Sequence, residues 1–159
     1  VRLYNLAIDH AFSRHVGLRC EDVMSRDVVT TTAEATLADA WYLMQKHRIK
    51  ALPVVDDASR LAGIVTLSDF FSHLRAAPAM DQGPSGWQDR RVADVMTAQV
   101  RTASPATPMA DLVREVAQTG RHHMPVTDEA GRLVGILTQS DMIAALYRRL
   151  ALESGESRR

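Results

Sequence analysis

Two short segments with the same polar pattern combine hydroxyl groups and a carboxylate within four residues. They are Thr66-Leu67-Ser68-Asp69 and Thr138-Gln139-Ser140-Asp141. Each follows an apolar run and precedes another, so each is expected where a strand ends and a helix begins. The first backbone amides of a helix have no partner within the helix. A carboxylate at this place can accept hydrogen bonds from two neighbouring hydroxyl groups, which suits a ribose ring.

The same segments also have a purely structural explanation. Ser68-Asp69 and Ser140-Asp141 could serve only as helix caps, with the acid placed favourably at the positive end of the helix dipole. The duplication favours a ligand site, although a cap can also be duplicated for stability alone. Both explanations stay open.

The polar segments belong to a longer internal repeat. Asp22-Val23-Met24 returns as Asp94-Val95-Met96, and residues 22–74 align with 94–146 without a gap. About 19 of about 53 aligned positions are identical, which chance does not produce. A unit this short cannot bury its own apolar face, so two copies are expected to pack around a pseudo-twofold axis. The seam between the repeats is then the expected site.

Each repeat is predicted to contain a strand, a helix, two strands and a second helix. This order predicts an α/β (α+β) fold in which a small sheet of about three strands packs with two helices. The predicted strands are 28–30, 51–55 and 61–66 in the first repeat and 100–102, 123–127 and 133–138 in the second.

The repeats divide the chain into five segments. We expect a lead-in helix, or a segment of a longer protein, over 1–17 and a disordered tail over 151–159. Between them lie the first repeat (18–75), a linker (76–91) and the second repeat (92–150). The linker is rich in proline and glycine, and Trp87 is its one residue expected to be held in place.

The ordered pattern resembles the CBS (cystathionine beta-synthase) domain. It runs from Asp-Val-Met through Val-x-Thr and a Pro-Val strand to Gly-Ile-(Val/Leu)-Thr-x-Ser-Asp, and it occurs twice, over about residues 18–150. Two tandem copies resemble a CBS pair, or Bateman module. The resemblance implies a regulatory module that binds an adenosine-type ligand in the cleft between the repeats and often forms a homodimer.

Three groups of residues are predicted to bind the ligand. Apolar strand positions could hold adenine, although core packing explains them equally well; basic positions before the Pro-Val strands resemble phosphate contacts, although a solvated basic edge is the alternative. Arg48 aligns with Gly120, so unequal affinities are expected. The candidates are Thr30, Leu52, Pro53, Thr102, Met124 and Pro125 for adenine, Lys50, His122 and His123 for phosphate, and Thr66, Ser68, Asp69, Thr138, Ser140 and Asp141 for ribose or phosphate.

Composition excludes several other classes. Nineteen basic and nineteen acidic residues give a net charge of zero, so nucleic acid is not expected as a partner. Cys20 is the single cysteine and cannot form an internal disulfide. His122 and His123 are adjacent on a strand and point to opposite faces, so no metal site is expected. No catalytic motif is present, so no enzyme activity and no cofactor are expected.

Two functions from different classes remain. The first is a ligand-sensing module that binds AMP, ADP, ATP or S-adenosylmethionine and regulates an attached or separate effector domain, either an enzyme or a membrane protein. The second is a structural module for dimerisation and tethering without a physiological nucleotide. We expect a soluble cytoplasmic module, either alone or as the cytoplasmic part of a larger membrane protein.

Overall fold

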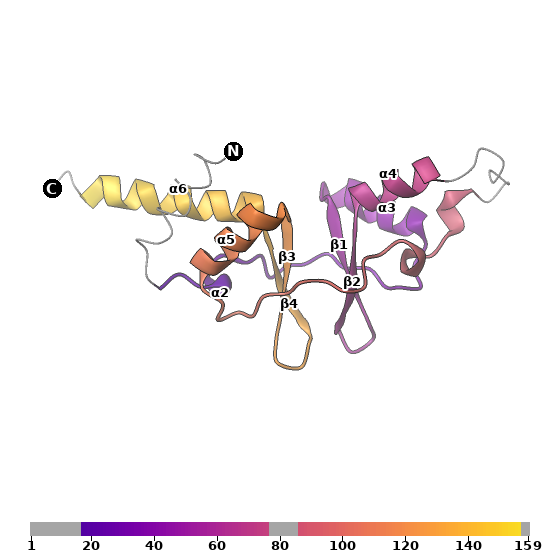
Figure 1. Cartoon of the computed structure of the whole chain (residues 1–159), viewed down its shortest axis with the longest axis horizontal. Coiled ribbons are helices and arrows are strands. Elements are labelled where there is room, and N and C mark those ends of the chain that lie inside the picture. Colours follow the sequence, from indigo (N-terminus) through magenta and orange to yellow (C-terminus); the bar gives the residue numbers. More distant parts are fainter. Residues whose placement is uncertain (1–16, 77–85, 157–159) are drawn as a thin grey trace. The chain divides into compact units, whose positions relative to one another are not determined.

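The computed structural model describes residues 17–76 and 86–156, which form two compact units. Unit 1 consists of the described parts of Val1–Asp27, Arg101–Glu129 and Val134–Arg159. Unit 2 consists of the described parts of Val28–Val100 and Ala130–Leu133. Each unit combines helices with a two-stranded antiparallel sheet, which confirms the predicted mixed α/β class (Figure 1).

Unit 2 is built around one hairpin. Strands β1 (Ala51–Val55) and β2 (Leu61–Thr66) pair in an antiparallel register with Ala51 opposite Thr66. The helices α3 (Leu37–His47) and α4 (Leu67–Ala76) come before and after this hairpin. Two short 3-10 turns complete the unit, η1 (Trp87–Asp89) and η2 (Val92–Asp94).

Unit 1 repeats this order with different side chains. Unit 1 begins with the short helix α2 (Cys20–Val23). The chain then forms most of unit 2 before it returns to unit 1 with α5 (Met109–Thr119). Strands β3 (His123–Thr127) and β4 (Leu133–Thr138) form the second hairpin, and α6 (Gln139–Glu156) begins directly after it.

The third strand predicted for each sheet is reduced to one bridging residue. Thr31 forms a parallel bridge with Val54, and Ala103 forms the same bridge with Val126. The predicted strands 28–30 and 100–102 are therefore not strands in the described structure. Each bridge is held by two backbone hydrogen bonds, such as Thr31 N to Pro53 O at 3.0 Å, and no ladder continues beyond it.

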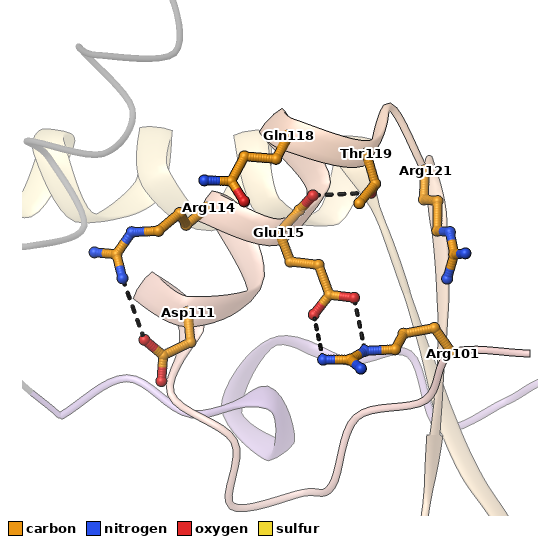
Figure 2. Close-up of a pocket in the computed structure, with 7 residues that line it drawn as sticks. All are labelled: Arg101, Asp111, Arg114, Glu115, Gln118, Thr119 and Arg121. Atoms are coloured by element: carbon orange, nitrogen blue, oxygen red, sulfur yellow. Dashed lines mark hydrogen bonds and ion pairs between the residues drawn. The ribbon is translucent and has the colours of Figure 1, made fainter.

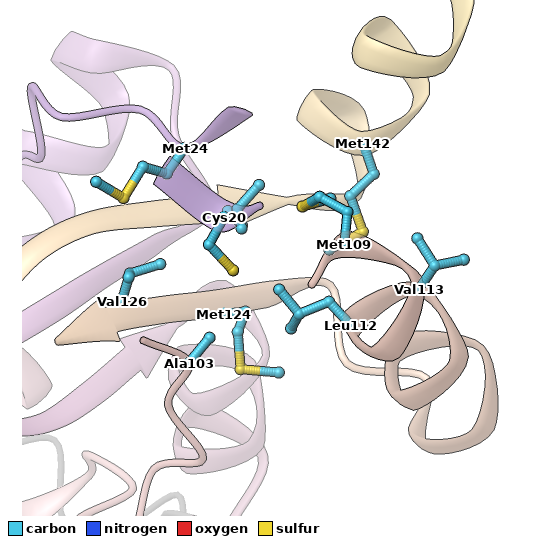
Figure 3. Packing of buried hydrophobic residues seen from close by; sticks show 10 residues of the cluster. Cys20, Met24, Ala103, Met109, Leu112, Val113, Met124, Val126 and Met142 are labelled. Carbon is cyan, nitrogen blue, oxygen red and sulfur yellow. The ribbon is translucent and has the colours of Figure 1, made fainter. Parts of the chain in front are cut away.

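The Asp-Val-Met segments are exchanged between the repeats. In unit 1, Cys20 and Met24 come from the first repeat and pack with Met109 and Met142 from the second (Figure 3). In unit 2, Val92 from the second repeat belongs to the core of the first. Each core therefore needs residues from both repeats, which explains how so short a repeat buries its apolar face.

Two glycines make room for the exchanged methionines. A Cβ atom added at Gly135 would lie 2.5 Å from the sulfur of Met24, and one added at Gly63 would lie 2.8 Å from the Thr97 carbonyl oxygen. Both distances are shorter than normal contacts, so the chain can pass this closely only where a side chain is missing.

The predictions for the two chain ends and the linker can be compared with the structure only over the described residues. α6 continues to Glu156, so residues 151–156 are helical rather than part of a disordered tail. The predicted lead-in helix over 1–17 lies almost wholly outside the described residues. Within the linker, Trp87 packs against the rings of Trp41 and Phe70, with ring centroids 6.4 and 6.1 Å away. In the part of the chain that is described, no helix has the length and apolar character to cross a membrane.

Candidate functional site

In unit 2, the carboxylate of Asp69 is held by the residue that ends the preceding strand. The backbone N–H and the hydroxyl of Thr66 both donate to Asp69 Oδ2, at 2.7 and 2.8 Å. The Asp69 N–H donates back to the Thr66 hydroxyl at 3.4 Å. This reciprocal pair fixes the rotamer of Asp69 at the first turn of α4 and leaves Oδ1 for other donors.

Unit 1 contains the same arrangement. The N–H and hydroxyl of Thr138 donate to Asp141 Oδ2, each at 2.8 Å, and Asp141 N–H donates to the Thr138 hydroxyl at 3.2 Å. Both aspartates are half-buried. We call these two places, Thr66–Asp69 and Thr138–Asp141, the ribose turns, after the ribose contact that the sequence predicts for them.

The ribose turns contain the cap that the structural explanation requires, but its residues differ from those expected. Threonine at the strand end is the N-cap, whereas Ser68 and Ser140 are exposed on the first helical turn. One carboxylate oxygen serves the cap and the other does not. Capping and ligand binding are therefore compatible in the same side chain.

A basic residue is joined to each ribose turn through the backbone. The carbonyl of Lys50 accepts from Leu67 N–H at 3.0 Å, and that of His122 accepts from Gln139 N–H at 3.1 Å. Both basic side chains are exposed. Gln139 was not among the predicted site residues, yet its Oε1 lies 2.8 Å from His122 Nδ1.

The strand positions predicted to hold adenine divide into two classes. Leu52 and Met124 are core residues with exposed fractions of 0% and 1%, which fits the packing explanation. Thr30 is half-buried and Thr102 exposed. A ligand contact at Leu52 or Met124 would have to come from the backbone, because their side chains are enclosed. Pro53 and Pro125 are buried, and their carbonyl oxygens accept hydrogen bonds from Thr31 N–H and Ala103 N–H, both at 3.0 Å. His123, one of the predicted phosphate contacts, is half-buried.

Arg48 and Gly120 end the equivalent helices α3 and α5 in the same conformation. Both residues have the left-handed helical backbone conformation, with φ of 53° for Arg48 and 67° for Gly120. Glycine adopts this conformation without cost, whereas for arginine it costs about 1–2 kcal/mol. Unit 2 therefore carries a strained cationic residue, two positions before Lys50, where unit 1 carries an unstrained neutral one.

The buried thiol of Cys20 takes no part in these turns. Burial raises its pKa from 9.0 to about 12, so the thiol stays protonated at neutral pH and is a poor nucleophile. Among the described residues, no group of three or more His, Cys, Asp or Glu side chains is placed to hold a metal ion. The chemistry that the ribose turns offer is binding through oxygen and nitrogen groups.

Two solved structures with bound ligands are similar to this chain. The CBS domain pair of protein MJ0100, in complex with 5'-methylthioadenosine and S-adenosyl-L-methionine, is 26% identical with a TM-score of 0.69, covering 82% of this chain and 95% of that one. CBSX2 in complex with AMP is 25% identical with a TM-score of 0.73, covering 83% and 98%.

Curated relatives include a transport protein and a dehydrogenase. The choline transport ATP-binding protein OpuBA of Bacillus subtilis is 30% identical over 129 residues, which cover 81% of this chain and 31% of the relative. Inosine-5'-monophosphate dehydrogenase of Bifidobacterium longum is 35% identical over 141 residues, covering 87% and 24%. The chain thus spans about a third or less of these relatives.

The family comparison agrees with the internal repeat. The CBS domain model matches residues 20–76 and again residues 92–148, which together make up most of the chain. These matches contain both ribose turns and both exchanged segments. The chain therefore belongs to the CBS domain family and carries two tandem CBS domains.

Proposed function

We propose that this chain is a regulatory module that senses an adenosine-type compound, namely AMP, ADP, ATP or S-adenosylmethionine. The observation that carries the proposal is the duplicated ribose turn. Each turn holds its aspartate in place through Oδ2 and keeps Oδ1 available, as the bonds of Asp69 and Asp141 show. Similar structures of the same family hold AMP in one case and S-adenosyl-L-methionine in another.

The ribose turn supplies a prepared acceptor. In our proposal, the two vicinal hydroxyls of ribose donate to the free Oδ1 edge of Asp69 or Asp141. Hydrogen bonds to an ionised carboxylate are roughly twice as strong as neutral ones. The cap bonds already fix the carboxylate, so little side-chain entropy is lost when the ligand binds.

The basic residues give each turn a different preference. Lys50 offers a flexible ammonium group that favours phosphate next to the turn of unit 2. The equivalent His122 offers an imidazole ring whose Nδ1 already lies 2.8 Å from Gln139 Oε1. We therefore propose that phosphorylated ligands bind more tightly at the turn of unit 2 than at the turn of unit 1.

The module is proposed to act on an effector domain rather than to catalyse a reaction. OpuBA and inosine-5'-monophosphate dehydrogenase are much longer than the chain, so the effector would be an attached domain or a separate partner. A ligand changes the effector only if it binds one conformation better than another. We place the module in the cytoplasm, where adenine nucleotides are present.

A dimerisation and tethering role is favoured by a separate observation. Phe71 and Ile143 occupy equivalent positions on α4 and α6, with exposed fractions of 55% and 43%, and Tyr147 is 75% exposed. Apolar side chains exposed on two equivalent helices are typical of an association surface. We propose a homodimer through these helices, a role that is compatible with ligand sensing.

Asparagine variants test the ribose turns without removing the cap. Asp69→Asn keeps one oxygen for Thr66 but replaces the other acceptor by an amide donor, and Asp141→Asn does the same in unit 1. Thermal unfolding is measured with AMP, ADP, ATP, S-adenosylmethionine and no ligand. At a hundredfold its Kd, a ligand adds about 2.7 kcal/mol, which corresponds to roughly 5–10 °C. We expect this shift to fall strongly in at least one variant.

Asp39→Asn is the matched control. Asp39 forms the same type of cap at the start of α3, where its Oδ2 accepts from the Thr36 hydroxyl at 2.8 Å. We expect the ligand shift of this variant to equal that of the unmodified chain. If no ligand shifts the melting temperature, or if all three variants shift alike, the sensing proposal is wrong and the tethering role becomes the better one.

A further inference from the structure

Unit 1 contains a shallow cavity of about 450 Å³, open to solvent, along one side of α5. Figure 2 shows the side chains around it, three of which are arginines. The lining residues are Arg101, Asp111, Arg114, Glu115, Gln118, Thr119 and Arg121. The volume falls within the range that small-molecule sites occupy.

Two of the arginines, Arg101 and Arg121, differ in their ion pairs and hydrogen bonds. Arg101 Nε lies 2.8 Å from Glu115 Oε1, and a second nitrogen of its guanidinium donates to Oε2 at 3.4 Å. Arg121, which is exposed, makes no ion pair or hydrogen bond to any residue in 17–76 or 86–156. Three arginines against two carboxylates leave a net positive charge in the cavity.

In unit 2, apolar side chains occupy the positions equivalent to three charged residues of the cavity. The residues of the first repeat that align with Arg101, Glu115 and Arg121 are Val29, Leu43 and Ile49. All three are half-buried and pack against the core of unit 2. The CBS fold can thus fill this place with apolar side chains, and unit 1 has exchanged them for two cations and one anion.

This exchange adds little to stability. Arg101 is 63% exposed and Glu115 25% exposed, and an ion pair this open to solvent contributes only about 0–1 kcal/mol. The Arg101–Glu115 pair does hold the Arg101 guanidinium against α5, in the lining of the cavity. Together with Arg121, it offers two planar groups of N–H donors that match the geometry of an oxyanion.

We propose that the cavity of Arg101, Glu115 and Arg121 binds the phosphate group of a small phosphorylated metabolite. Arg121 supplies the free charge, and Arg101 supplies the donors that Glu115 does not use. The site lies on unit 1 alone, involves none of the residues of the ribose turns, and does not depend on the sensing function proposed above.

The test is a titration of the 159-residue chain with inorganic phosphate, followed by the NMR signals of the arginine Nε–H groups. We expect the signals of Arg121 and Arg101 to shift and to saturate. Ribose 5-phosphate should shift the same signals, whereas glutamate, which offers carboxylates instead, should bind at least tenfold more weakly.

Variants taken from the first repeat remove the site while keeping the fold. Arg121→Ile should weaken phosphate binding at least tenfold. The triple variant Arg101→Val, Glu115→Leu and Arg121→Ile rebuilds the apolar arrangement of unit 2 and should abolish binding while remaining folded. Arg148→Gln, an exposed arginine on α6, is the control and should bind phosphate normally.

Three outcomes would overturn the proposal. They are the absence of saturable shifts at Arg121, unchanged phosphate binding in the folded triple variant, and glutamate binding as tight as phosphate binding, which would point to an acidic partner. Adenosine, which lacks phosphate, provides a separate test of the ribose turns. Either proposal can therefore fail while the other holds.

Discussion

The two units place the same elements around interiors of different chemistry. Unit 2 contains an aromatic group in which the ring centroids of Trp41, Phe70 and Trp87 lie 5.7–6.4 Å apart. The core of unit 1 is richer in sulfur, with four buried methionines and one cysteine against the single buried methionine, Met44, of unit 2. Met142 aligns with Phe70, and Val113 aligns with Trp41. The same hydrophobic pattern therefore maintains the fold with side chains of different size and chemistry.

This difference gives each unit its own intrinsic probe. Both tryptophans of the chain, Trp41 and Trp87, belong to unit 2, and its one cysteine, Cys20, belongs to unit 1. Tryptophan fluorescence therefore reports on unit 2, and thiol labelling reports on unit 1.

The largest expected effect comes from emptying the aromatic group. Phe70 is 2% exposed, and Phe70→Ala should lower the free energy of unfolding by about 3–5 kcal/mol because it leaves a cavity between two tryptophans. Met142→Ala should cost less within the range of about 2–5 kcal/mol, since methionine neighbours adapt to a gap. The two variants are compared by urea unfolding, which is followed by tryptophan fluorescence and by thiol labelling.

Each variant should shift mainly the probe of its own unit. If Phe70→Ala shifts both probes equally, and Met142→Ala does so as well, the two cores unfold as one body and the comparison between them fails.

A smaller effect is expected where the exchanged segments pass the glycines. Gly63→Ala places a Cβ against a backbone carbonyl, that of Thr97, which is held by hydrogen bonds to Ile64 at 2.9 and 3.0 Å. Gly135→Ala first meets the flexible end of Met24. Overpacking costs about 1–3 kcal/mol, and we expect Gly63→Ala to be the more destabilising of the two. Thermal unfolding of both variants measures the difference, and a larger loss for Gly135→Ala would contradict it.

The smallest effect concerns Cys20 and depends on pH. Because burial raises its pKa to about 12, the folded chain holds the thiol proton more tightly than the unfolded chain does. The thiol's contribution to stability is fully present below pH 9.0 and is lost as the pH rises towards 12. Cys20→Val, which introduces the residue found at the aligned Val92, should differ by less than about 1.5 kcal/mol at pH 7.

The control for this prediction is the pH profile itself. Urea unfolding between pH 8 and about pH 10.5 should show a loss of stability in the unmodified chain that is smaller in Cys20→Val. Parallel profiles, or rapid thiol labelling of the folded chain at pH 8, would show that the thiol is not enclosed.

The repeat made much of the fold predictable from the sequence. Strands β1 and β2, together with β3 and β4, were predicted with the boundaries that the structure has, because each apolar run is bounded by polar turn residues. The third strand predicted for each repeat was wrong, because the chain forms only a single bridge there, at Thr31 or Ala103, and its short apolar run does not extend that bridge into a strand. The extension of α6 to Glu156 was missed because Ser154 and Gly155 near its end are poor helix formers.

The positions of Asp69 and Asp141 at helix starts were predictable, but their hydrogen bonds were not. Sequence placed Asp69 and Asp141 at helix starts, yet it assigned the cap to serine, because spacing alone does not distinguish Thr66 from Ser68 as the last residue outside the helix. The cavity near Arg121 was not predicted, since it depends on Arg101 lying beside α5 in space. Aligning the repeats for polar exchanges at apolar positions could have indicated it.

The exchanged segments set an order in which the chain can complete its units during synthesis. Almost all of unit 2 is the continuous stretch Val28–Val100, so its core can close soon after that stretch leaves the ribosome. Cys20 and Met24 are made earlier, yet their partners Met109 and Met142 arrive much later. The first residues of unit 1 must therefore wait, with their apolar side chains uncovered, until the stretch up to Met142 has been made.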